Sequence, residues 1–328
     1  MTEPIPSCPK IVVLDGATLN PGDLSWSSFE ALGALTVYDY TAPEDVVTRL
    51  ENATIALTNK TVMTEDIMAQ LPMLRYIGAL ATGYNVIDVD AAAKRNIVVT
   101  NIPEYATFAT AQMTIALLLE LADLVGHHDA LVHDGAWESS KYFCFWDGSL
   151  TELCGLTIGL FGFGKIARRV AVIADALGMK VLATRRTPPK DSDDIPNFVT
   201  LVSQEELFHQ SDVLSFHCPL TPETQGLVRK ETIAQMKDGV WLLNTSRGPV
   251  FQEEDVAAAL ETGKIGGVGV DVLSREPADS SNPLLHAPHC IITPHIAWAP
   301  TKTRARLMET AKENIRAYLS GNLINMVF

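Results

Sequence analysis

The sequence predicts an α/β protein built from two doubly wound parallel sheets, and three observations support that prediction. Short apolar runs alternate with helical stretches through the first hundred residues, and the same alternation restarts after Gly155. Continuous apolar strands separated by helices are typical of parallel sheets that are covered on both faces. A chain of 328 residues is also long for a single core, so we expect two domains.

In the first part of the chain, five apolar runs are expected to form buried strands. They cover residues 10–16, 35–40, 53–59, 74–80 and 96–102. Helices are expected between them, over residues 24–33, 43–52, 64–71 and 88–96. Pro43 and Thr64 are good helix starts because two acidic residues follow each of them.

A long apolar helix is expected over Ala106–Val125. In a soluble protein such a helix must be buried between domains or between subunits, and we interpret it as the contact surface of a homodimer. Residues 130–150 are aperiodic and interrupted by glycine, which indicates a loop. The aromatic side chains at 142–146 are expected either to reach a substrate cleft or to belong to a subunit interface.

After Gly155 the pattern predicts a second sheet of six strands. They cover residues 156–162, 180–186, 212–218, 240–246, 266–273 and 290–296. Helices are expected near residues 203–210 and over 252–263. The chain then ends in an amphipathic helix over 301–322, which Gly321 is expected to cap.

Composition and charge exclude several classes of partner. A net charge of −14 argues against nucleic acid or an anionic membrane, although a few local arginines can still bind a small anion. No apolar run reaches membrane-spanning length, and "MTEPIPSCPK" does not resemble a secretory signal, so we expect a cytoplasmic protein. The five cysteines lack CxxC spacing and HExxH is absent, so we expect reduced thiols and no metal.

The stretch "GLFGFGKIARRVA" follows an expected strand, opens a helix and places Gly162, Gly164 and Ala167 at the spacing of a dinucleotide-binding turn. The first glycine permits the tight turn, the second lets a pyrophosphate approach the backbone, and the small third residue lets helix meet strand. The helix N-terminus would present N–H groups to the phosphates. We therefore assign Gly162, Gly164, Lys165 and Ile166 to a cofactor site.

The next expected strand ends in Thr184, Arg185 and Arg186. An acid at this place would bind the ribose 2′-hydroxyl of NADH, whereas arginine suits the 2′-phosphate of NADPH. We therefore expect NADPH to be preferred, with NADH as a possible second cofactor. Thr184 can add a hydroxyl donor, and Pro188 and Pro189 would stiffen the loop. The alternative is a solvated basic strand end, which would make the two cofactors equally effective.

Three reactive side chains follow later strands, at the sheet edge where ligands bind in such folds. Arg247 can hold a carboxylate through two parallel hydrogen bonds. The stretch "VDVLSREP" supplies two carboxylates, Asp271 and Glu276, and His295 follows the last strand, so a carboxylate is available to form an acid–base pair with the histidine. The alternatives are a structural salt bridge for Arg247 and a packed core histidine for His295.

Together these motifs resemble the D-isomer-specific 2-hydroxyacid dehydrogenase family. The matching stretches are "LFGFGKIA", "SFHCPLTPETQGLV", "LLNTSRGPVFQEEDVAAAL", "GGVGVDVLSREP" and "TPHIAWAP". With "ALATGYNVIDVDAAAKRNIVVTNIP" at the front, the resemblance covers nearly the whole chain. "ALATGYNVID", "FCFW" and "PHIAWA" look most like its glycerate dehydrogenase (hydroxypyruvate or glyoxylate reductase) branch.

The resemblance implies how the chain is divided. Residues 103–296 would form a Rossmann NAD(P)-binding domain, and residues 1–102, completed by 297–328, a flavodoxin-like substrate domain. Arg247 would bind the substrate carboxylate, Glu276 would orient His295, and His295 would donate the proton.

Further residues receive a role from the same resemblance. Substrate would also be held by the backbone N–H groups of Ala81, Thr82 and Gly83. The cofactor would also contact Cys218, Pro219, Thr245 and Asp271. Trp298 stands where the family commonly has a small residue, so it is expected near the substrate.

The predicted activity is reversible reduction of a small 2-oxo acid, hydroxypyruvate or glyoxylate, to the D-2-hydroxy acid with NADPH. One alternative is a phosphite or formate dehydrogenase of the same fold. Formate enzymes of this fold carry glutamine where this chain has Glu276, which counts against that alternative. A second alternative is a nucleotide-sensing binding protein, since transcriptional corepressors share the fold.

Overall fold

The computed structural model describes residues 8–187 and 194–328. Pro188 and Pro189, expected to stiffen the loop after the two arginines, lie outside the described residues. The chain divides into two compact units. Unit 1 holds the residues up to Ala106 together with Ala299–Phe328, and unit 2 holds Thr107–Trp298.

Unit 1 is a parallel sheet of five strands in the order β2-β1-β3-β4-β5. The strands are β1 (Lys10–Val13), β2 (Ala34–Val37), β3 (Ile55–Thr58), β4 (Tyr76–Ala79) and β5 (Val98–Thr100). Each lies inside or next to an apolar run of the sequence. The order is that of flavodoxin-like doubly wound sheets, as predicted.

Helices cover both faces of this sheet. They are α1 (Ser27–Glu30), η1 (Pro43–Asp45), α2 (Val46–Leu50), α3 (Glu65–Ala69), α4 (Val89–Lys94) and α11 (Thr301–Leu319). The Thr64 hydroxyl caps α3 by accepting from Ile67 N–H, as its position predicts. The ring of Tyr318 on α11 lies 4.9 Å from that of Tyr76 on β4, so α11 belongs to unit 1 although it comes last in the chain.

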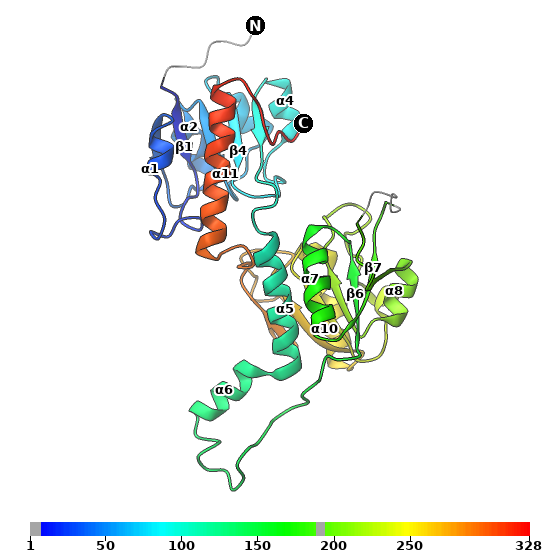
Figure 1. Ribbon diagram of the computed structural model, residues 1–328. Helices are drawn as coiled ribbons and strands as arrows, with labels where there is room; N and C mark the ends of the chain where they lie inside the picture. Colours follow the sequence, from blue (N-terminus) through cyan, green and yellow to red (C-terminus); the bar gives the residue numbers. More distant parts are fainter. Residues whose placement is uncertain (1–7, 188–193) are drawn as a thin grey trace. The chain divides into compact units, whose positions relative to one another are not determined.

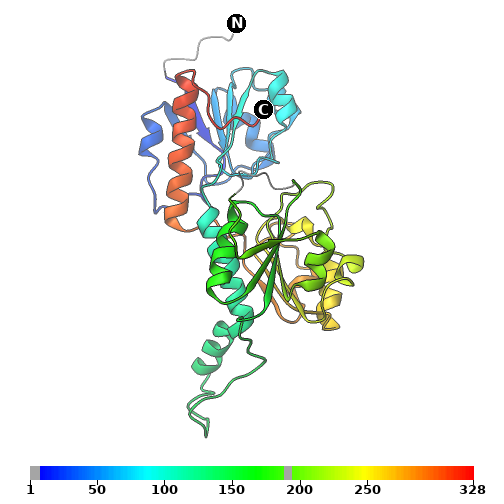
Figure 2. The ribbon, with the colours of Figure 1, turned by 45° about the vertical axis from the view of Figure 1, so that its right-hand side comes forward.

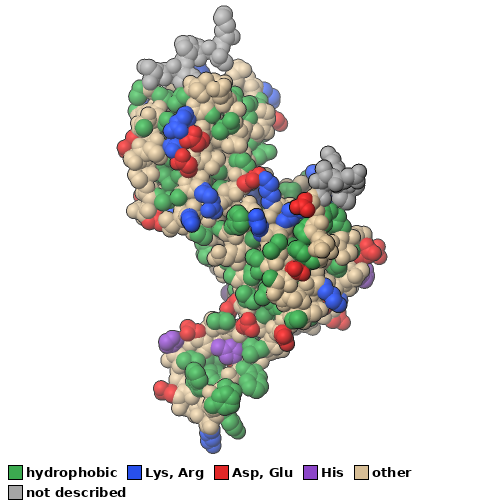
Figure 3. All heavy atoms as spheres, in the orientation of Figure 1, with side chains coloured by type: hydrophobic (Ala, Val, Ile, Leu, Met, Phe, Trp, Pro, Cys, Tyr) green, Lys and Arg blue, Asp and Glu red, His purple; other side chains and the backbone are tan. Residues whose placement is uncertain are grey.

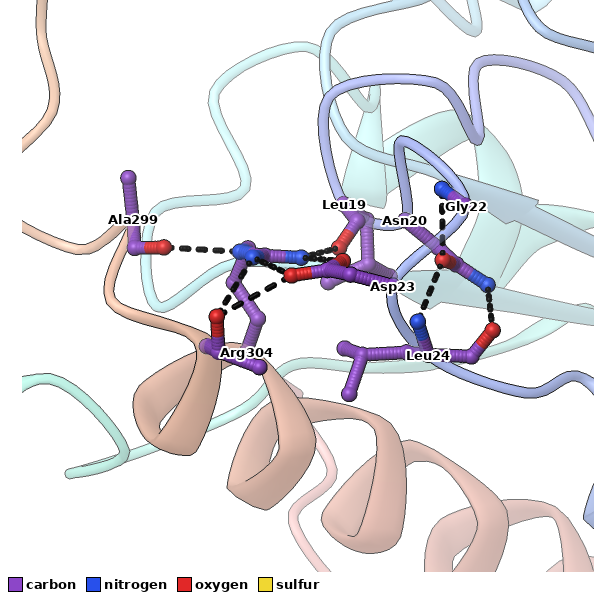
Figure 4. Close-up of polar contacts among 8 residues, drawn as sticks. Leu19, Asn20, Gly22, Asp23, Leu24, Ala299 and Arg304 are labelled. Carbon is purple, nitrogen blue, oxygen red and sulfur yellow. Dashed lines mark hydrogen bonds and ion pairs between the residues drawn. The ribbon is translucent and has the colours of Figure 1, made fainter.

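The first turn of α11 is tied to two distant segments by arginines. Arg304 donates to the carboxylate of Asp23 at 2.6 and 2.8 Å and to the carbonyls of Leu19 and Ala299 (Figure 4). Arg306 donates to the carbonyl of Tyr105 at 2.9 Å. Tyr105 and Ala299 lie next to the two points where the chain passes from one unit to the other. Arginines of α11 therefore fix the backbone of unit 1 beside both of these points.

Unit 2 is a parallel sheet of seven strands in the order β12-β11-β10-β9-β6-β7-β8. The strands are β6 (Thr157–Phe161), β7 (Lys180–Thr184), β8 (Val199–Leu201), β9 (Val213–Phe216), β10 (Val240–Asn244), β11 (Ile265–Val270) and β12 (Cys290–Ile292). The predicted number of six was wrong, because β8, an edge strand of 3 residues, was not expected. The strand order reverses between β6 and β9, where doubly wound folds bind dinucleotides.

Unit 2 contains helices that cover both faces of its sheet, together with α6, which extends away from the sheet (Figure 1). They are α5 (Thr107–Asp123), α6 (Val125–His133), α7 (Lys165–Ala176), α8 (Gln204–Gln210), α9 (Lys230–Ile233), η2 (Gly248–Val250), α10 (Glu253–Glu261) and η3 (Pro283–Leu285). One core joins α5 and α7 to the sheet, and a second joins α8, α9 and α10 to the other face (Figures 1 and 2).

The apolar face of α5 is buried on its own sheet. A Cβ added to Gly269 would lie 3.0 Å from Leu117 Cβ, and one added to Gly267 would lie 3.0 Å from Leu121 Cδ2. Glycine on β11 therefore lets α5 approach closely. The apolar residues of α5 that face the sheet are covered within unit 2, whereas Phe108 on the same helix is 62% exposed. The expectation that this helix forms a homodimer interface therefore stays a prediction.

The helix also ends earlier than expected, at Asp123, because Leu124 adopts a left-handed φ of 50°. The following α6 occupies the start of the expected loop. Among the described residues, no single helix is long and apolar enough to span a membrane, and one bent pair, α5 with α6 at 58°, passes the length and composition test.

We call residues 125–150 the arm. The arm extends from unit 2 (Figure 1) and carries exposed hydrophobic side chains (Figure 3). Tyr142 and Phe143 of the arm are 77% and 90% exposed. Its backbone is nevertheless fixed by internal bonds: Trp137 Nε1–H donates to the carbonyl of Phe143 at 3.1 Å, and Asp147 N–H donates to His128 Nε2 at 3.0 Å.

Candidate active site

The predicted glycine turn joins β6 to α7. Gly162 has a left-handed φ of 92°, and a Cβ there would come within 2.9 Å of the carbonyl oxygen of His217. Both constraints require glycine. Its N–H donates to the carbonyl of Thr184 at 3.1 Å, so the turn lies directly beside the end of β7.

Gly164, the N-cap of α7, has a different reason to be glycine. Its backbone is extended, and a Cβ added there would meet nothing within 4 Å. The protein's own atoms therefore leave open space at the N-terminus of a helix of 12 residues, which begins with Lys165 and Ile166. A dinucleotide pyrophosphate needs such a space, and the buried Ala167 lets the helix approach the sheet, so the residues fit this cofactor.

Arg185 and Arg186 follow β7 immediately, next to the glycine turn. Arg185 is half-buried and Arg186 is exposed. A hydrogen bond from Thr221 lowers the pKa of Glu223, and the charge of Arg186 adds a smaller contribution in the same direction. Arg186 therefore already has an acidic neighbour, Glu223. A cofactor phosphate would have to compete with this carboxylate for Arg186.

Three neighbouring strands place the predicted catalytic residues at one edge. The last residues of β10, β11 and β12 are in register, with Asn244 opposite Val270 and Val270 opposite Ile292. The segments that carry Arg247, Glu276 and His295 follow these strand ends. Parallel strands end at the same edge, so the fold brings together residues that are far apart in the sequence.

His295 and Glu276 form the predicted pair. Nδ1 of His295 lies 2.6 Å from Oε2 of Glu276, and Leu273 N–H donates to the other carboxylate oxygen at 3.2 Å. The two side chains are 29% and 31% exposed. Nε2 of His295 makes no hydrogen bond with any residue that the structure describes, so the ring can exchange a proton with another molecule there.

Asp271 fixes the segment around His295. His295 has a left-handed φ of 54°, which strains a residue with a Cβ. Before it, the Thr293 hydroxyl donates to the Asp271 carboxylate at 2.5 Å; after it, Ile296 and Ala297 donate their N–H groups at 2.9 Å. A carboxylate has about four acceptor positions, so the predicted contact with the nicotinamide amide stays a prediction that this geometry allows.

Arg247 is half-buried at the end of the loop that follows β10. Its Nη1 donates to the carbonyl of Ser246 at 2.7 Å, and its own carbonyl accepts from the amide of Asn244 at 2.9 Å. Within residues 8–187 and 194–328 it has no ion-pair partner, so the alternative of a structural salt bridge receives no support. Its remaining donors are suited to a carboxylate ligand.

The other predicted cofactor residues follow β9 and β10. Burial raises the pKa of the Cys218 thiol to about 11, so it stays protonated at neutral pH. Pro219 is exposed, and its carbonyl accepts from Thr224. Thr114 donates its hydroxyl proton to the carbonyl of Thr110, so the Thr245 hydroxyl donates to Thr114 at 2.9 Å. Contact of these residues with a cofactor remains a prediction.

The predicted substrate residues belong to different units. Ala81, Thr82 and Gly83 follow β4 of unit 1, and the Ala81 carbonyl accepts from Ile102 N–H at 2.9 Å. The predicted contact with substrate uses the N–H groups of these three residues, whereas the contact with Ile102 uses the carbonyl of Ala81. Trp298 is half-buried and is the last residue of unit 2.

Glu253, the first residue of α10, was not predicted to belong to the site. This carboxylate is buried and accepts two hydrogen bonds from Ser274 and one from Asn282. A signal was present: the spacing of Glu253 from the buried Val256, Ala257 and Leu260 puts an acid on the apolar stripe of the helix.

Comparison with known proteins agrees with this architecture. Residues 115–297 match the model of the D-isomer specific 2-hydroxyacid dehydrogenase, NAD binding domain. A hydroxypyruvate reductase of Blautia hydrogenotrophica is 50% identical over 323 residues, which cover 97% of this chain and 99% of that protein. A glycerate dehydrogenase of Methylorubrum extorquens is 36% identical, with coverage of 97% and 98%.

Solved structures give the same result. The TT0316 protein of Thermus thermophilus superposes with a TM-score of 0.85 and 34% identity, covering 97% of this chain and all of that chain. An NADPH-dependent glyoxylate/hydroxypyruvate reductase of Sinorhizobium meliloti, solved with NADP and malonate, gives 0.83 and 26%, with coverage of 98% and 97%. The chain belongs to the D-isomer-specific 2-hydroxyacid dehydrogenase family.

Proposed function

We propose that the protein reduces hydroxypyruvate or glyoxylate to the corresponding D-2-hydroxy acid with NADPH, in a reversible reaction. The observation that carries the proposal is the His295–Glu276 pair, 2.6 Å apart and partly exposed at the edge of the sheet. The names of the relatives, hydroxypyruvate reductase and glycerate dehydrogenase, support the choice of substrate.

The residues divide the chemistry between them. A bound nicotinamide cofactor supplies the hydride that the 2-carbon of the oxo acid receives. Arg247 binds the substrate carboxylate through its free guanidinium donors. His295 gives the proton on Nε2 to the developing alkoxide oxygen, and Glu276 stabilises the imidazolium through Nδ1. In the oxidation direction, His295 takes that proton back.

A compact polar substrate follows from the bulk of Trp298, next to the His295 segment in the sequence. The test is to measure kcat/KM for hydroxypyruvate, glyoxylate, pyruvate and 4-methyl-2-oxopentanoate with each nicotinamide cofactor. We expect hydroxypyruvate and glyoxylate to rank first. A higher value for 4-methyl-2-oxopentanoate would contradict the proposed substrate class.

The preference for NADPH rests on Arg185 and Arg186, which follow the strand beside the glycine turn. A charge-assisted contact contributes roughly 1.5–3 kcal/mol, so removing both arginines should lower the NADPH/NADH ratio of kcat/KM by about 10- to 100-fold. Lys180→Ala, which removes one positive charge from the other end of β7, is the matched control. A wild-type preference for NADH, or a ratio that the double variant leaves unchanged, would refute this role.

The alternatives make different predictions. A formate or phosphite dehydrogenase would reduce NAD(P) with those donors and would not turn over 2-oxo acids. A nucleotide-sensing binding protein would bind NADPH in a calorimeter and would show no turnover with any of these substrates.

A homodimer is also part of the proposal, through α5 as predicted from the sequence, with the arm as a second candidate surface. The exposed aromatic side chains of the arm are held on an ordered backbone, which suits an interface with a second copy. Light scattering should give about 71 kDa, twice the chain mass of 35.7 kDa. A mass near that of one chain at micromolar concentration would contradict it.

A further inference from the structure

Glu253 is a buried carboxylate to which the proposed mechanism assigns no role. It is 7% exposed, and its three hydrogen-bond donors are neutral groups. Ser274 donates its N–H at 2.7 Å and its hydroxyl, and Asn282 donates its amide at 2.9 Å. Burying a charge is costly even at a helix N-terminus, so these bonds compensate for a substantial penalty.

The bonds to Ser274 fix the backbone that holds the catalytic carboxylate. Leu273, the preceding residue, donates its N–H to Oε1 of Glu276 at 3.2 Å. Oε2 of the same carboxylate lies 2.6 Å from Nδ1 of His295. A chain of contacts therefore runs from Glu253 through Leu273–Ser274 to the pair that handles the proton.

The same backbone segment supports the loop of Arg247. A Cβ added to Gly248 would lie 1.9 Å from the carbonyl carbon of Leu273 and 2.3 Å from the nitrogen of Ser274. The loop after β10 therefore lies directly on the segment after β11. Glu253, which ends the first loop and bonds to the second, ties the two together.

We propose that Glu253 is a positioning residue for the Glu276–His295 pair, acting through the Leu273–Ser274 backbone. The inference rests on the proposed reductase function for its kinetic test only. Asp271 holds the His295 segment from the other side. Other charged or titratable groups on the surrounding elements include Arg247 after β10, Glu254 and Asp255 on α10, and His286 and His289 between η3 and β12. The Arg275–Asp279 ion pair, at 2.6 Å, lies on the segment of Glu276 itself.

Glu253→Gln tests the proposal because it keeps the shape of the side chain but replaces one acceptor oxygen by an amide donor. That donor faces the donors of Ser274 or Asn282, so the segment must shift. We expect kcat to fall roughly 3- to 30-fold. KM should change less than about threefold, because Glu253 does not contact substrate. Glu254→Gln, the same charge change on the exposed neighbouring residue, should leave both constants unchanged.

The pH profile separates positioning from a loss of folded protein. A less well-held Glu276 stabilises the imidazolium less, so the pH at which kcat falls to half should move down by about half a unit in Glu253→Gln. In a Glu276→Gln background the same substitution should cause no further shift. An unchanged pH profile with only a lower Tm, or additive shifts in the double variant, would overturn the proposal.

A spectroscopic measurement tests the inference without turnover. The Nδ1 proton of His295, hydrogen-bonded to a carboxylate at 2.6 Å, should give a low-field NMR signal that disappears in His295→Ala. Glu253→Gln should weaken or move this signal, and Glu254→Gln should not. A signal that is the same in wild type and Glu253→Gln would refute the positioning role, whereas a wild type that fails to turn over any 2-oxo acid would refute the proposed function alone.

Discussion

The Arg304–Asp23 pair of unit 1 and the His295–Glu276 pair of unit 2 both join nitrogen to oxygen at 2.6 Å, but they differ in what surrounds them. The Arg304 side chain is 7% exposed, and each of its three nitrogens donates to a described residue (Figure 4). His295 uses one ring nitrogen for Glu276, and the other makes no hydrogen bond with a described residue.

The length of an ion pair therefore does not identify a catalytic site. The difference lies in the hydrogen-bonding capacity that remains. A pair whose buried arginine has every nitrogen hydrogen-bonded fixes two segments of the fold, whereas a partly exposed pair with one nitrogen left over can move a proton. The two pairs can be separated by experiment, because one should control activity and the other stability.

The largest effect is expected from His295→Ala. It removes the proton donor, so kcat should fall by about 10²- to 10⁴-fold at neutral pH. The melting temperature should change little because the side chain is partly exposed. Initial rates and a thermal melt on the same preparation measure both quantities. Near-normal turnover would show that this pair is not the proton donor.

A smaller effect, on stability and not on chemistry, is expected from Arg304→Met. The carbonyls of Leu19 and Ala299 would lose their donor, so the free energy of unfolding should fall by about 1–3 kcal/mol. Arg316→Met is the control, because it removes an exposed ion pair with Glu313 at the other end of α11. Urea denaturation measures the difference. Equal midpoints for the two variants would contradict the structural role of Arg304.

The smallest effect is expected on the stability of the fold at acidic pH. Hydrogen bonds from Arg304 lower the pKa of Asp23 from 3.8 to about 2. A carboxyl with a lowered folded-state pKa stabilises the fold above its unfolded value and loses that contribution as the pH falls from 3.8 towards 2. Wild type should therefore exceed Asp23→Asn in urea midpoint at pH 7, and the two should converge on acidification. A gap that widens towards pH 3 would exclude this linkage.

Local patterns were sufficient to predict most of the fold and part of the site. Apolar runs mark buried strands because both faces of these sheets are covered, so every strand except the edge strand β8 appeared where expected. The strand–turn–helix pattern predicted the roles of Gly162 and Gly164. The family resemblance predicted the pairing of His295 with Glu276. The left-handed break at Leu124 was not predictable, since neither glycine nor proline marks it.

The supporting carboxylates were harder to predict because their partners are distant in sequence. Asp271 bonds to Ile296 and Ala297, and Glu253 bonds to Ser274 and Asn282. Only the folded sheet edge brings these loops together. The close packing of α5 on its own sheet was not predictable for a related reason, since the glycines of β11 that allow it follow much later in the chain.

The late position of α11 has a consequence for synthesis on the ribosome. The strands of unit 1 are complete at Thr100, but the helix that packs Tyr318 on Tyr76 starts only at Thr301. All of unit 2 emerges in the interval and can fold as a continuous segment. Unit 1 is therefore the first unit to emerge and the last to be completed. Until α11 has been made, the sheet of unit 1 exposes an apolar face that chaperones can recognise.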